Sequence, residues 1–395
     1  MNLPPLILHK NADRRLKKGH LWVYSNEVNI DKTPLKSLTA GQQVDILTAS
    51  GQPLGVAMVN PNSLICGRLV SRKGELNKAL LVRRIKQALA LREQCFKQPY
   101  YRLIYGDSDF LPGLVVDRFN DQLVVQIASA GMELLQDDIV QSLQKVLSPT
   151  GIILRNDHIA RELEGLEAKV ELIGDVSEWL EVRENDCVFQ VPAREGQKTG
   201  WFYDHRLNRA YLQQLVKGKR VLDVFSYAGG WGIEAAVAGA SAVTCVDTSE
   251  QALQWLQRNS ALNKVEDKVS SVQGKAIAVL KQMIADGEKF DVVVLDPPAF
   301  IKKRKDQRAG EAAYRHLNEL AIRLLNQQGL LVSASCSMPL SNEGLTEIVR
   351  GAARHLDRQA QLIWRGGQAP DHPVHPAIPE TEYLKAQFYC LSPVI

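Results

Sequence analysis

One cysteine and three aspartates stand where apolar runs in the second half of the chain end. Asp223, Asp247 and Asp296 follow or close three such runs, and Cys336 follows GLLVSAS. A cysteine at the end of a strand is most often a small core residue. It is also a nucleophile when deprotonated, and thiolate addition to carbon 6 of a pyrimidine turns carbon 5 into an enamine that can take a methyl group. The residues around Cys336 decide between these two roles.

The first of these runs leads into a glycine-rich loop, VLDVFSYAGGWG (221–232). Glycines let a backbone approach a ligand closely, and the following helix start presents free amides. The spacing is not GxGxxG, and Asp223 precedes the loop. A carboxylate there repels a pyrophosphate but suits the ammonium of an amino acid moiety, as in S-adenosyl-L-methionine (SAM). Asp247 can accept hydrogen bonds from both ribose hydroxyls, which fits SAM and NAD equally.

The sequence DPPAF (296–300) forms the third feature. Two prolines after Asp296 predict a rigid turn. Asp296 could hold the polar edge of a base, because the exocyclic amine of cytosine is a donor. The basic run that follows contains Lys302, Lys303 and Arg304 and suits a phosphodiester backbone, although a solvated charged loop is the alternative.

These residues need a scaffold, and the pattern from about residue 195 onward predicts one. Continuous apolar runs alternate with helical periodicity, which is typical of a parallel sheet covered by helices on both faces. Ligands in such α/β folds bind beyond the carboxyl ends of the strands. The four residues above would therefore lie at one edge of the sheet.

The first 194 residues differ from this pattern. Residues 1–75 read as short strands separated by turn signals and predict a compact β domain. Its segment 9–20 is rich in cations and precedes Trp22 and Tyr24. Basic residues beside aromatics suit RNA, and a solvated face beside two core aromatics is the alternative. The candidate RNA-binding cations are Arg14, Arg15, Lys17 and Lys18.

Residues 76–194 predict a central α+β domain, with helices over 76–97 and 133–147 and a hairpin over 111–128. We find no catalytic pattern there. The expected domains are therefore 1–75, 76–194 and 195–395.

Bulk composition adds weaker constraints. The chain has 395 residues, a net charge of +4 and six scattered cysteines. The charge permits a nucleic-acid partner without requiring one. The cysteines form no CxxC pair, so reduced thiols are expected and a zinc site or disulfide framework is not. We see no signal peptide or membrane-length apolar segment, and expect a cytoplasmic protein.

Five segments in order resemble the bacterial ribosomal RNA large subunit methyltransferase I family: KTGWFYDHR (198–206), VLDVFSYAGGWG (221–232), DPPAF (296–300), SCS (335–337) and DHPVHPAIPETEYLK (371–385). The resemblance spans the whole chain. It implies an N-terminal PUA-like RNA-binding domain, a central α+β domain and a class I SAM-dependent methyltransferase domain with a Rossmann-like, mostly parallel seven-stranded sheet. It also implies 5-methylcytosine formation in 23S ribosomal RNA and a possible homodimer.

The resemblance assigns roles residue by residue. Asp296 matches the base-holding acid and Cys336 the nucleophile. The positions that match the SAM site are Thr199, Phe202, Arg206, Asp223, Phe225, Tyr227, Gly229, Asp247 and Gly274. Lys275 departs from the family, because related enzymes often carry an acid there and a lysine cannot accept a hydrogen bond from the adenine amine.

Three alternatives stay open at the level of sequence. DPP followed by an aromatic also resembles enzymes that methylate exocyclic amines of adenine or guanine, which need no cysteine. A ribosome-assembly protein that binds RNA without catalysis is the second. A nicotinamide dehydrogenase is the third, and the loop spacing disfavours it. The base that takes the carbon-5 proton is also open: His372 and His375 are candidates, although histidines of a surface loop are the plainer interpretation.

Overall fold

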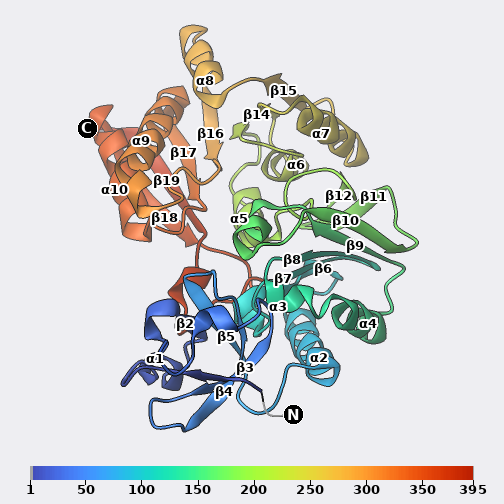
Figure 1. The fold of residues 1–395 in the computed structure, drawn as a ribbon. Coiled ribbons are helices and arrows are strands. Elements are labelled where there is room, and N and C mark those ends of the chain that lie inside the picture. The colour runs from blue at the N-terminus through green and yellow to red at the C-terminus, as the bar shows by residue number, and fades with distance from the viewer. Residues whose placement is uncertain (1–2, 395) are drawn as a thin grey trace. The chain divides into compact units, whose positions relative to one another are not determined.

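The protein is described by a computed structural model that covers residues 3–394. The chain forms two compact units (Figure 1). Unit 1 comprises Met1–Leu180, Pro192–Trp201 and Pro370–Thr381. Unit 2 comprises Glu181–Val191, Phe202–Ala369 and Glu382–Ile395. Each unit therefore collects segments that are distant in sequence.

Unit 1 begins with a five-stranded sheet of order β1-β3-β4-β5-β2. Its elements are β1 (Pro5–Ile7), α1 (Arg14–Lys17), β2 (Trp22–Tyr24), β3 (Gln43–Leu47), β4 (Pro53–Val59) and β5 (Ile65–Ser71). Alternate residues of the strands point inward, and Leu6, Val23, Val44 and Ile46 are almost completely buried. This is the compact β domain that the short strands and turns predict.

A second five-stranded sheet in unit 1 has the order β10-β9-β8-β7-β6. Its elements are α2 (Lys78–Cys95), β6 (Tyr100–Tyr105), β7 (Leu114–Phe119), β8 (Gln122–Ile127), α3 (Ala130–Glu133), α4 (Gln136–Leu147), β9 (Gly151–Asn156) and β10 (Lys169–Gly174). The expected hairpin is present, with Asn120 at φ 60° in its turn. The expected helix over 133–147 is split, because Leu135 leaves helical geometry between α3 and α4.

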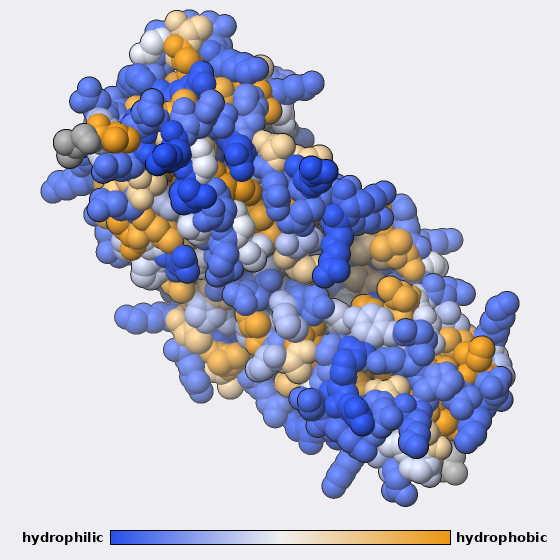
Figure 2. Space-filling view, turned by 90° about the vertical axis from the view of Figure 1, so that its left-hand side faces the viewer, coloured by the Kyte–Doolittle hydropathy of each residue, from blue (hydrophilic) through white to orange (hydrophobic). Residues whose placement is uncertain are grey.

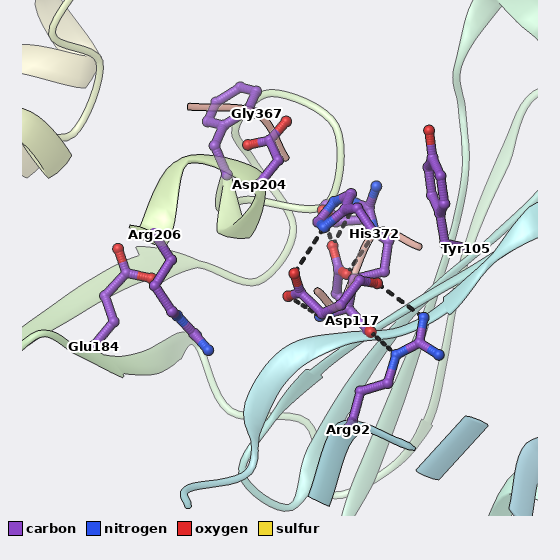
Figure 3. A network of polar contacts seen from close by, with 12 residues as sticks. Arg92, Tyr105, Asp117, Glu184, Asp204, Arg206, Gly367 and His372 are labelled. Atoms are coloured by element: carbon purple, nitrogen blue, oxygen red, sulfur yellow. Dashed lines mark hydrogen bonds and ion pairs between the residues drawn. The ribbon is translucent and has the colours of Figure 1, made fainter. Parts of the chain in front are cut away.

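A buried network of charges ties three segments of unit 1 together, and Figure 3 shows Arg92, Asp117 and His372 from it. The Arg92 guanidinium donates to both oxygens of Asp109 at 2.6 and 2.7 Å. Arg102 donates to both oxygens of Asp117, each at 2.8 Å. The carbonyl of Asp371 accepts from Arg92 at 2.8 Å. Residues 370–381 are thereby anchored to β6 and α2.

Unit 2 is built on a seven-stranded sheet of order β15-β14-β13-β16-β17-β19-β18, with β19 antiparallel to its two neighbours and the other strand pairs parallel. Its strands are β13 (Arg220–Val224), β14 (Ala242–Asp247), β15 (Val269–Gln273), β16 (Phe290–Leu295), β17 (Leu325–Ser335), β18 (Arg358–Gly366) and β19 (Lys385–Pro393). A two-stranded sheet of β11 (Trp179–Glu184) and β12 (Cys187–Pro192) precedes it. This confirms the expected mostly parallel seven-stranded sheet.

Two groups of helices pack on this sheet. One is α5 (Arg206–Gln213), α6 (Gly230–Val237) and α7 (Glu250–Leu262), and the other is α8 (Ala276–Ala285), α9 (Gln307–Leu324) and α10 (Asn342–His355). The central strand β16 reads FDVVVL and is buried at every position except Asp291, because helices cover both faces of the sheet. The register pairs Leu295 of β16 with Ser333 of β17, so the residues that follow both strands emerge at the same edge.

Hydrophilic residues dominate the face shown in Figure 2, and apolar residues appear there in small groups. Scattered exposed apolar side chains are normal for a folded protein. None of the helices formed by residues 3–394 combines the length and the apolar character that a membrane span requires.

Candidate active site

Asp223 lies at the end of β13 in a fully buried position. Its Oδ2 accepts a hydrogen bond from the amide of Gly232 at 2.9 Å, and Oδ1 is buried without a hydrogen-bond partner. Burial raises the pKa of Asp223 to about 8. The cation that acts on Asp223, Arg209, is itself bound to Glu184 and Glu234, so a ligand ammonium that reached Oδ1 would supply a direct partner.

The loop after Asp223 has an unusual backbone. Phe225, Tyr227 and Gly229 have φ values of 70°, 49° and 92°, in the left-handed region. Such a conformation in a non-glycine residue costs on the order of 1–3 kcal/mol and tends to cluster at ligand sites. A Cβ on Gly232 would lie 2.5 Å from Cys245 Sγ and 3.2 Å from Asp223 Oδ2, so this position needs glycine.

Asp247 joins this loop to the end of β14. Its Oδ2 accepts from the amide of Tyr227 and its Oδ1 from the amide of Ser249, both at 2.9 Å. The side chain is only half-buried. A carboxylate has about four lone-pair directions, so capacity remains for two ligand hydroxyls. Together, Asp223 and Asp247 fit a ligand that carries both an ammonium and a ribose, as SAM does.

Several other residues predicted for the SAM site gather around the same loop. The ring of Phe202 packs edge-to-face on Tyr227, with ring centroids 5.5 Å apart. The amide of Gly274 donates to the carbonyl of Asp247 at 2.9 Å. Lys275 is the N-cap residue directly before α8, and it is exposed to solvent.

Two predicted cofactor residues have other partners. The Arg206 Nε lies 3.3 Å from Glu184 Oε2, and the two side chains are buried together (Figure 3). Thr199 belongs to unit 1, where its hydroxyl donates to Asp117. Their roles in SAM binding stay predictions.

Asp296 follows β16 and contacts two residues that sequence reasoning missed. Trp231 Nε1 donates to its Oδ2 at 3.1 Å, and His205 Nε2 lies 3.2 Å from its Oδ1. Burial alone would raise the pKa of Asp296, but the charge and hydrogen bond of His205 outweigh it and lower that pKa. The side chain is still 22% exposed, so it can contact a substrate.

A signal for both residues exists in the sequence. Trp231 interrupts a glycine-rich loop, where a bulky side chain needs a reason, and His205 lies within KTGWFYDHR. Neither could be assigned to Asp296 without the fold, because the three residues come from separate elements.

Cys336 follows β17 and is half-buried. Its Sγ lies 3.9 Å from the carbonyl oxygen of Pro297, in the turn after Asp296. The strand-end cysteine and the DPPAF turn are therefore neighbours. That proximity separates Cys336 from the fully buried cysteines Cys66, Cys187 and Cys245.

The serines on either side of Cys336 hold its turn in place. Ser335 and Ser337 both form hydrogen bonds with the Tyr314 hydroxyl, at 2.8 and 2.9 Å. Ser337 Oγ also accepts from the amide of Ile301 at 3.1 Å. One hydroxyl network thus fixes the turns that carry Cys336 and Asp296 relative to each other.

The candidate RNA-binding residues fall into two groups. Lys302, Lys303 and Arg304 are exposed after the DPPAF turn, and Arg14 and Lys18 are exposed in unit 1. Arg15 instead donates to both oxygens of Glu27 at 2.8 Å, and Lys17 pairs with Asp13 at 2.5 Å.

The interpretation of His372 and His375 as surface-loop histidines is wrong. They are 2% and 8% exposed, within unit 1. His372 Nδ1 lies 2.9 Å from Asp371 Oδ1, and the His375 ring packs on Phe110. The anchoring of residues 370–381 to the charge network buries them.

The sheet order, the left-handed loop and the two strand-end carboxylates define a SAM-dependent methyltransferase. Two family models match the chain: a PUA-like domain over residues 6–72, and "conserved hypothetical protein 95" over residues 208–337. The first match agrees with the N-terminal β domain, and the second spans the strands that carry Asp223, Asp296 and Cys336.

Relatives that match over nearly the full length of the chain identify the methyltransferase family. The ribosomal RNA large subunit methyltransferase I of Tolumonas auensis is 36% identical, over 96% of this chain and 97% of the relative. That of Klebsiella pneumoniae is 35% identical, over 98% of both. The chain therefore belongs to the ribosomal RNA large subunit methyltransferase I family.

Solved structures agree with the fold. A Streptococcus mutans protein assigned as a SAM-dependent methyltransferase superposes with a TM-score of 0.82 at 20% identity, covering 98% of this chain and all of that one (100%). A protein assigned as a methyltransferase and solved with SAH gives 0.84 at 20% identity, with the same coverage. These two structures agree with the fold, and the family assignment together with the loop held by Asp223 and Asp247 identifies SAM as the cofactor.

Proposed function

We propose that the protein forms 5-methylcytosine in large-subunit (23S) ribosomal RNA, with Cys336 as the nucleophile and Asp296 as the residue that holds the base. The observation that carries the proposal is the contact between the two turns. Cys336 Sγ lies 3.9 Å from the Pro297 carbonyl, and Ser337 bonds to Ile301 beyond the same DPPAF turn. A base held at Asp296 would lie beside the thiol.

The chemistry suits a carbon that is a weak nucleophile by itself. SAM supplies, when bound, a methyl group on a positively charged sulfur. The Cys336 thiolate would form a bond to carbon 6, and the ring electrons would move to carbon 5. Carbon 5 would take the methyl group as the methyl–sulfur bond breaks and the neutral thioether S-adenosylhomocysteine leaves. Loss of the carbon-5 proton restores the double bond and expels the thiolate.

Asp296 has the properties of a base-holding acid. The proximity of His205 keeps it ionised, and an ionised carboxylate is only an acceptor. The exocyclic amine of cytosine is a donor, so the pair is complementary. Asp223 and Asp247 would hold the ammonium and the ribose of SAM, with Phe202, Tyr227 and Gly274 around them.

RNA contacts are proposed at exposed cations. Lys302, Lys303 and Arg304 follow the base-holding turn directly and suit the backbone near the modified nucleotide. The predicted RNA-binding segment of the PUA-like domain offers the exposed cations Arg14 and Lys18, while Lys17 is exposed but paired with Asp13. We further propose that the enzyme works in the cytoplasm and as a homodimer, as its family resemblance implies.

Nucleoside mass spectrometry after incubation of large-subunit RNA with labelled SAM tests the proposal. The wild type should yield labelled 5-methylcytosine, and Cys336→Ala should yield none. Cys390→Ala removes an exposed cysteine of β19 and is the matched control. Labelled methyladenine or methylguanine that survives Cys336→Ala would instead assign the DPPAF turn to amine methylation.

RNA that contains 5-fluorocytosine gives a second readout. Fluorine at carbon 5 blocks the final elimination, so the wild type should form a covalent adduct that mass spectrometry locates at Cys336. An active enzyme that forms no adduct would rule out the covalent mechanism.

A further inference from the structure

Lys385 is a buried lysine that the proposed mechanism does not yet use. It is the first residue of β19, it pairs in register with Ser335 of β17, and it is 5% exposed. Its Nζ donates to the carbonyl of Ser337 at 2.7 Å and to the carbonyl of Tyr383 at 2.8 Å. One of these bonds therefore reaches the residue directly after Cys336.

The partners of this ammonium are unusual for a buried charge. Both are neutral carbonyls, whereas buried lysines are normally paired with a carboxylate. Two bonds also leave one of the three N–H donors of an ammonium for a further acceptor. An uncharged donor could form the same two hydrogen bonds, so the carbonyls do not explain why a charged group is buried here. A negatively charged group close to Lys385 would explain it.

Two ionisable groups act on Lys385, namely Cys336 and the exposed Glu382. Burial lowers the pKa of Lys385 to about 8, and Cys336 opposes that effect. Lys385 therefore remains mostly charged at neutral pH. Glu382 is in water and screened, which leaves the half-buried Cys336 as the partner of opposite sign when it is deprotonated.

The surroundings of the sulfur agree with this pairing. In the thiol form, Cys336 can donate to the Pro297 carbonyl 3.9 Å away. A thiolate cannot donate, and a carbonyl oxygen repels it, so the deprotonated form needs a cation. The hydroxyl of Tyr314, which also acts on Cys336, carries no positive charge and is bound to Ser335 and Ser337.

We propose that Lys385 is a positioning residue that holds the Cys336 turn through the Ser337 carbonyl and stabilises the thiolate by its charge. The thiol proton leaves to solvent, and Lys385 keeps its own protons throughout. The thiolate then bonds to carbon 6 and is released again on elimination. This role deepens the proposed function and rests on it, although the thiolate itself can be tested without RNA or SAM.

The test is the pH dependence of Cys336 alkylation by iodoacetamide, followed by peptide mass spectrometry. In Lys385→Met the midpoint of the rate profile should move to higher pH, and the rate at neutral pH should fall about tenfold, because only the thiolate reacts. Lys385→Arg keeps the charge and should retain most of the rate. Cys390, on the same strand and exposed, is the internal control and should not change.

Lys289→Met is the matched control variant, because Lys289 also donates to a carbonyl, that of Arg323, in an exposed position. It should leave the Cys336 profile unchanged. An identical midpoint in the wild type and Lys385→Met would overturn the proposal. If Lys385→Met does not fold, the wild type decides: a Cys336 midpoint no lower than that of Cys390 contradicts a stabilised thiolate.

The two proposals fail in distinguishable ways. A shifted midpoint without a 5-fluorocytosine adduct would support Lys385 and reject the covalent function. An adduct together with an unshifted midpoint would support the function and reject the role of Lys385.

Discussion

Two regions of the molecule bury charged groups, and they differ in how completely those groups are paired. In unit 1, Arg92 and Arg102 each meet both oxygens of one carboxylate, Asp109 and Asp117 respectively. In unit 2, the buried Asp223 has one oxygen bound to an amide and the other without a partner. Both arrangements are buried, but only the first is saturated.

The difference separates a structural network from a binding site. A carboxylate whose two oxygens both accept from a guanidinium has its charge compensated within the chain, and its value lies in joining segments of the chain. An unsaturated carboxylate costs stability until a ligand completes it. Asp296 lies between these two cases. Trp231 and His205 contact its carboxylate, but the side chain remains 22% exposed and can still contact a ligand.

The largest effect is expected from breaking the saturated network. Asp117→Ala removes a fully buried carboxylate and leaves the Arg102 guanidinium, which is 12% exposed, without its partner, so it should cost about 3–5 kcal/mol of stability. The expected result is a clearly lower melting temperature in thermal unfolding. Glu347→Ala, which removes an exposed pair with Arg350, is the control and should leave the melting temperature unchanged. Equal melting temperatures for the two variants would contradict the comparison.

Asp296→Asn should act on catalysis rather than on stability. It preserves volume but removes the charge opposite His205, and methylation should fall about 10²- to 10³-fold. Labelled-methyl transfer to RNA measures the rate, and calorimetry should find SAM affinity unchanged. A parallel loss of SAM affinity would mean that Asp296 serves the cofactor instead of the base.

Asp223→Asn should have opposite effects on stability and binding. Because the folded-state pKa is raised from 3.8 to about 8, the native state loses stability as pH rises between these values. Asparagine carries no charge, so the ligand-free variant should melt a few degrees higher at neutral pH, an effect of about 1–2 kcal/mol. SAM affinity should fall about tenfold, for lack of the carboxylate.

The same pKa predicts proton release on SAM binding. The neutral Asp223 of the free enzyme should ionise when an ammonium reaches it, so wild-type affinity should strengthen as pH rises toward about 8. Calorimetry in buffers of different ionisation enthalpy measures the released proton. A binding enthalpy that does not depend on the buffer would count against this role for Asp223.

The smallest effect is expected at the surface. Arg14→Ala with Lys18→Ala should weaken RNA binding about three- to tenfold and reduce the salt dependence by about 1.4 in log–log slope, as for two phosphates on a single strand. Fluorescence anisotropy across a salt series measures both. Lys32→Ala with Lys36→Ala removes two exposed cations elsewhere in the same domain and is the control. An unchanged slope would make Arg14 and Lys18 ordinary surface residues.

The sequence located the strand ends well because the apolar character of a buried strand is a local property of the chain. A strand covered on both faces is mainly apolar, so a carboxylate directly after the apolar run marks its end, as at Asp247 and Asp296. The sequence indicated only part of the left-handed loop. A glycine such as Gly229 is a usual sign of a positive φ, but Phe225 and Tyr227 also have positive φ values and gave no such sign. The burial of His372 and His375 had no local signal.

The sequence by itself determined which chemistry was available: a cysteine, three strand-end acids and a rigid proline turn, in an order typical of one enzyme family. Only the tertiary structure decided the partners, such as His205 and Trp231 for Asp296, Glu184 for Arg206, and Lys385 for the Cys336 turn. The physical reason is that strand composition follows from burial, a local quantity, whereas partners follow from strand order. The antiparallel insertion of β19 beside β17 brings Lys385 to Ser337, and no periodicity in the sequence encodes that neighbour.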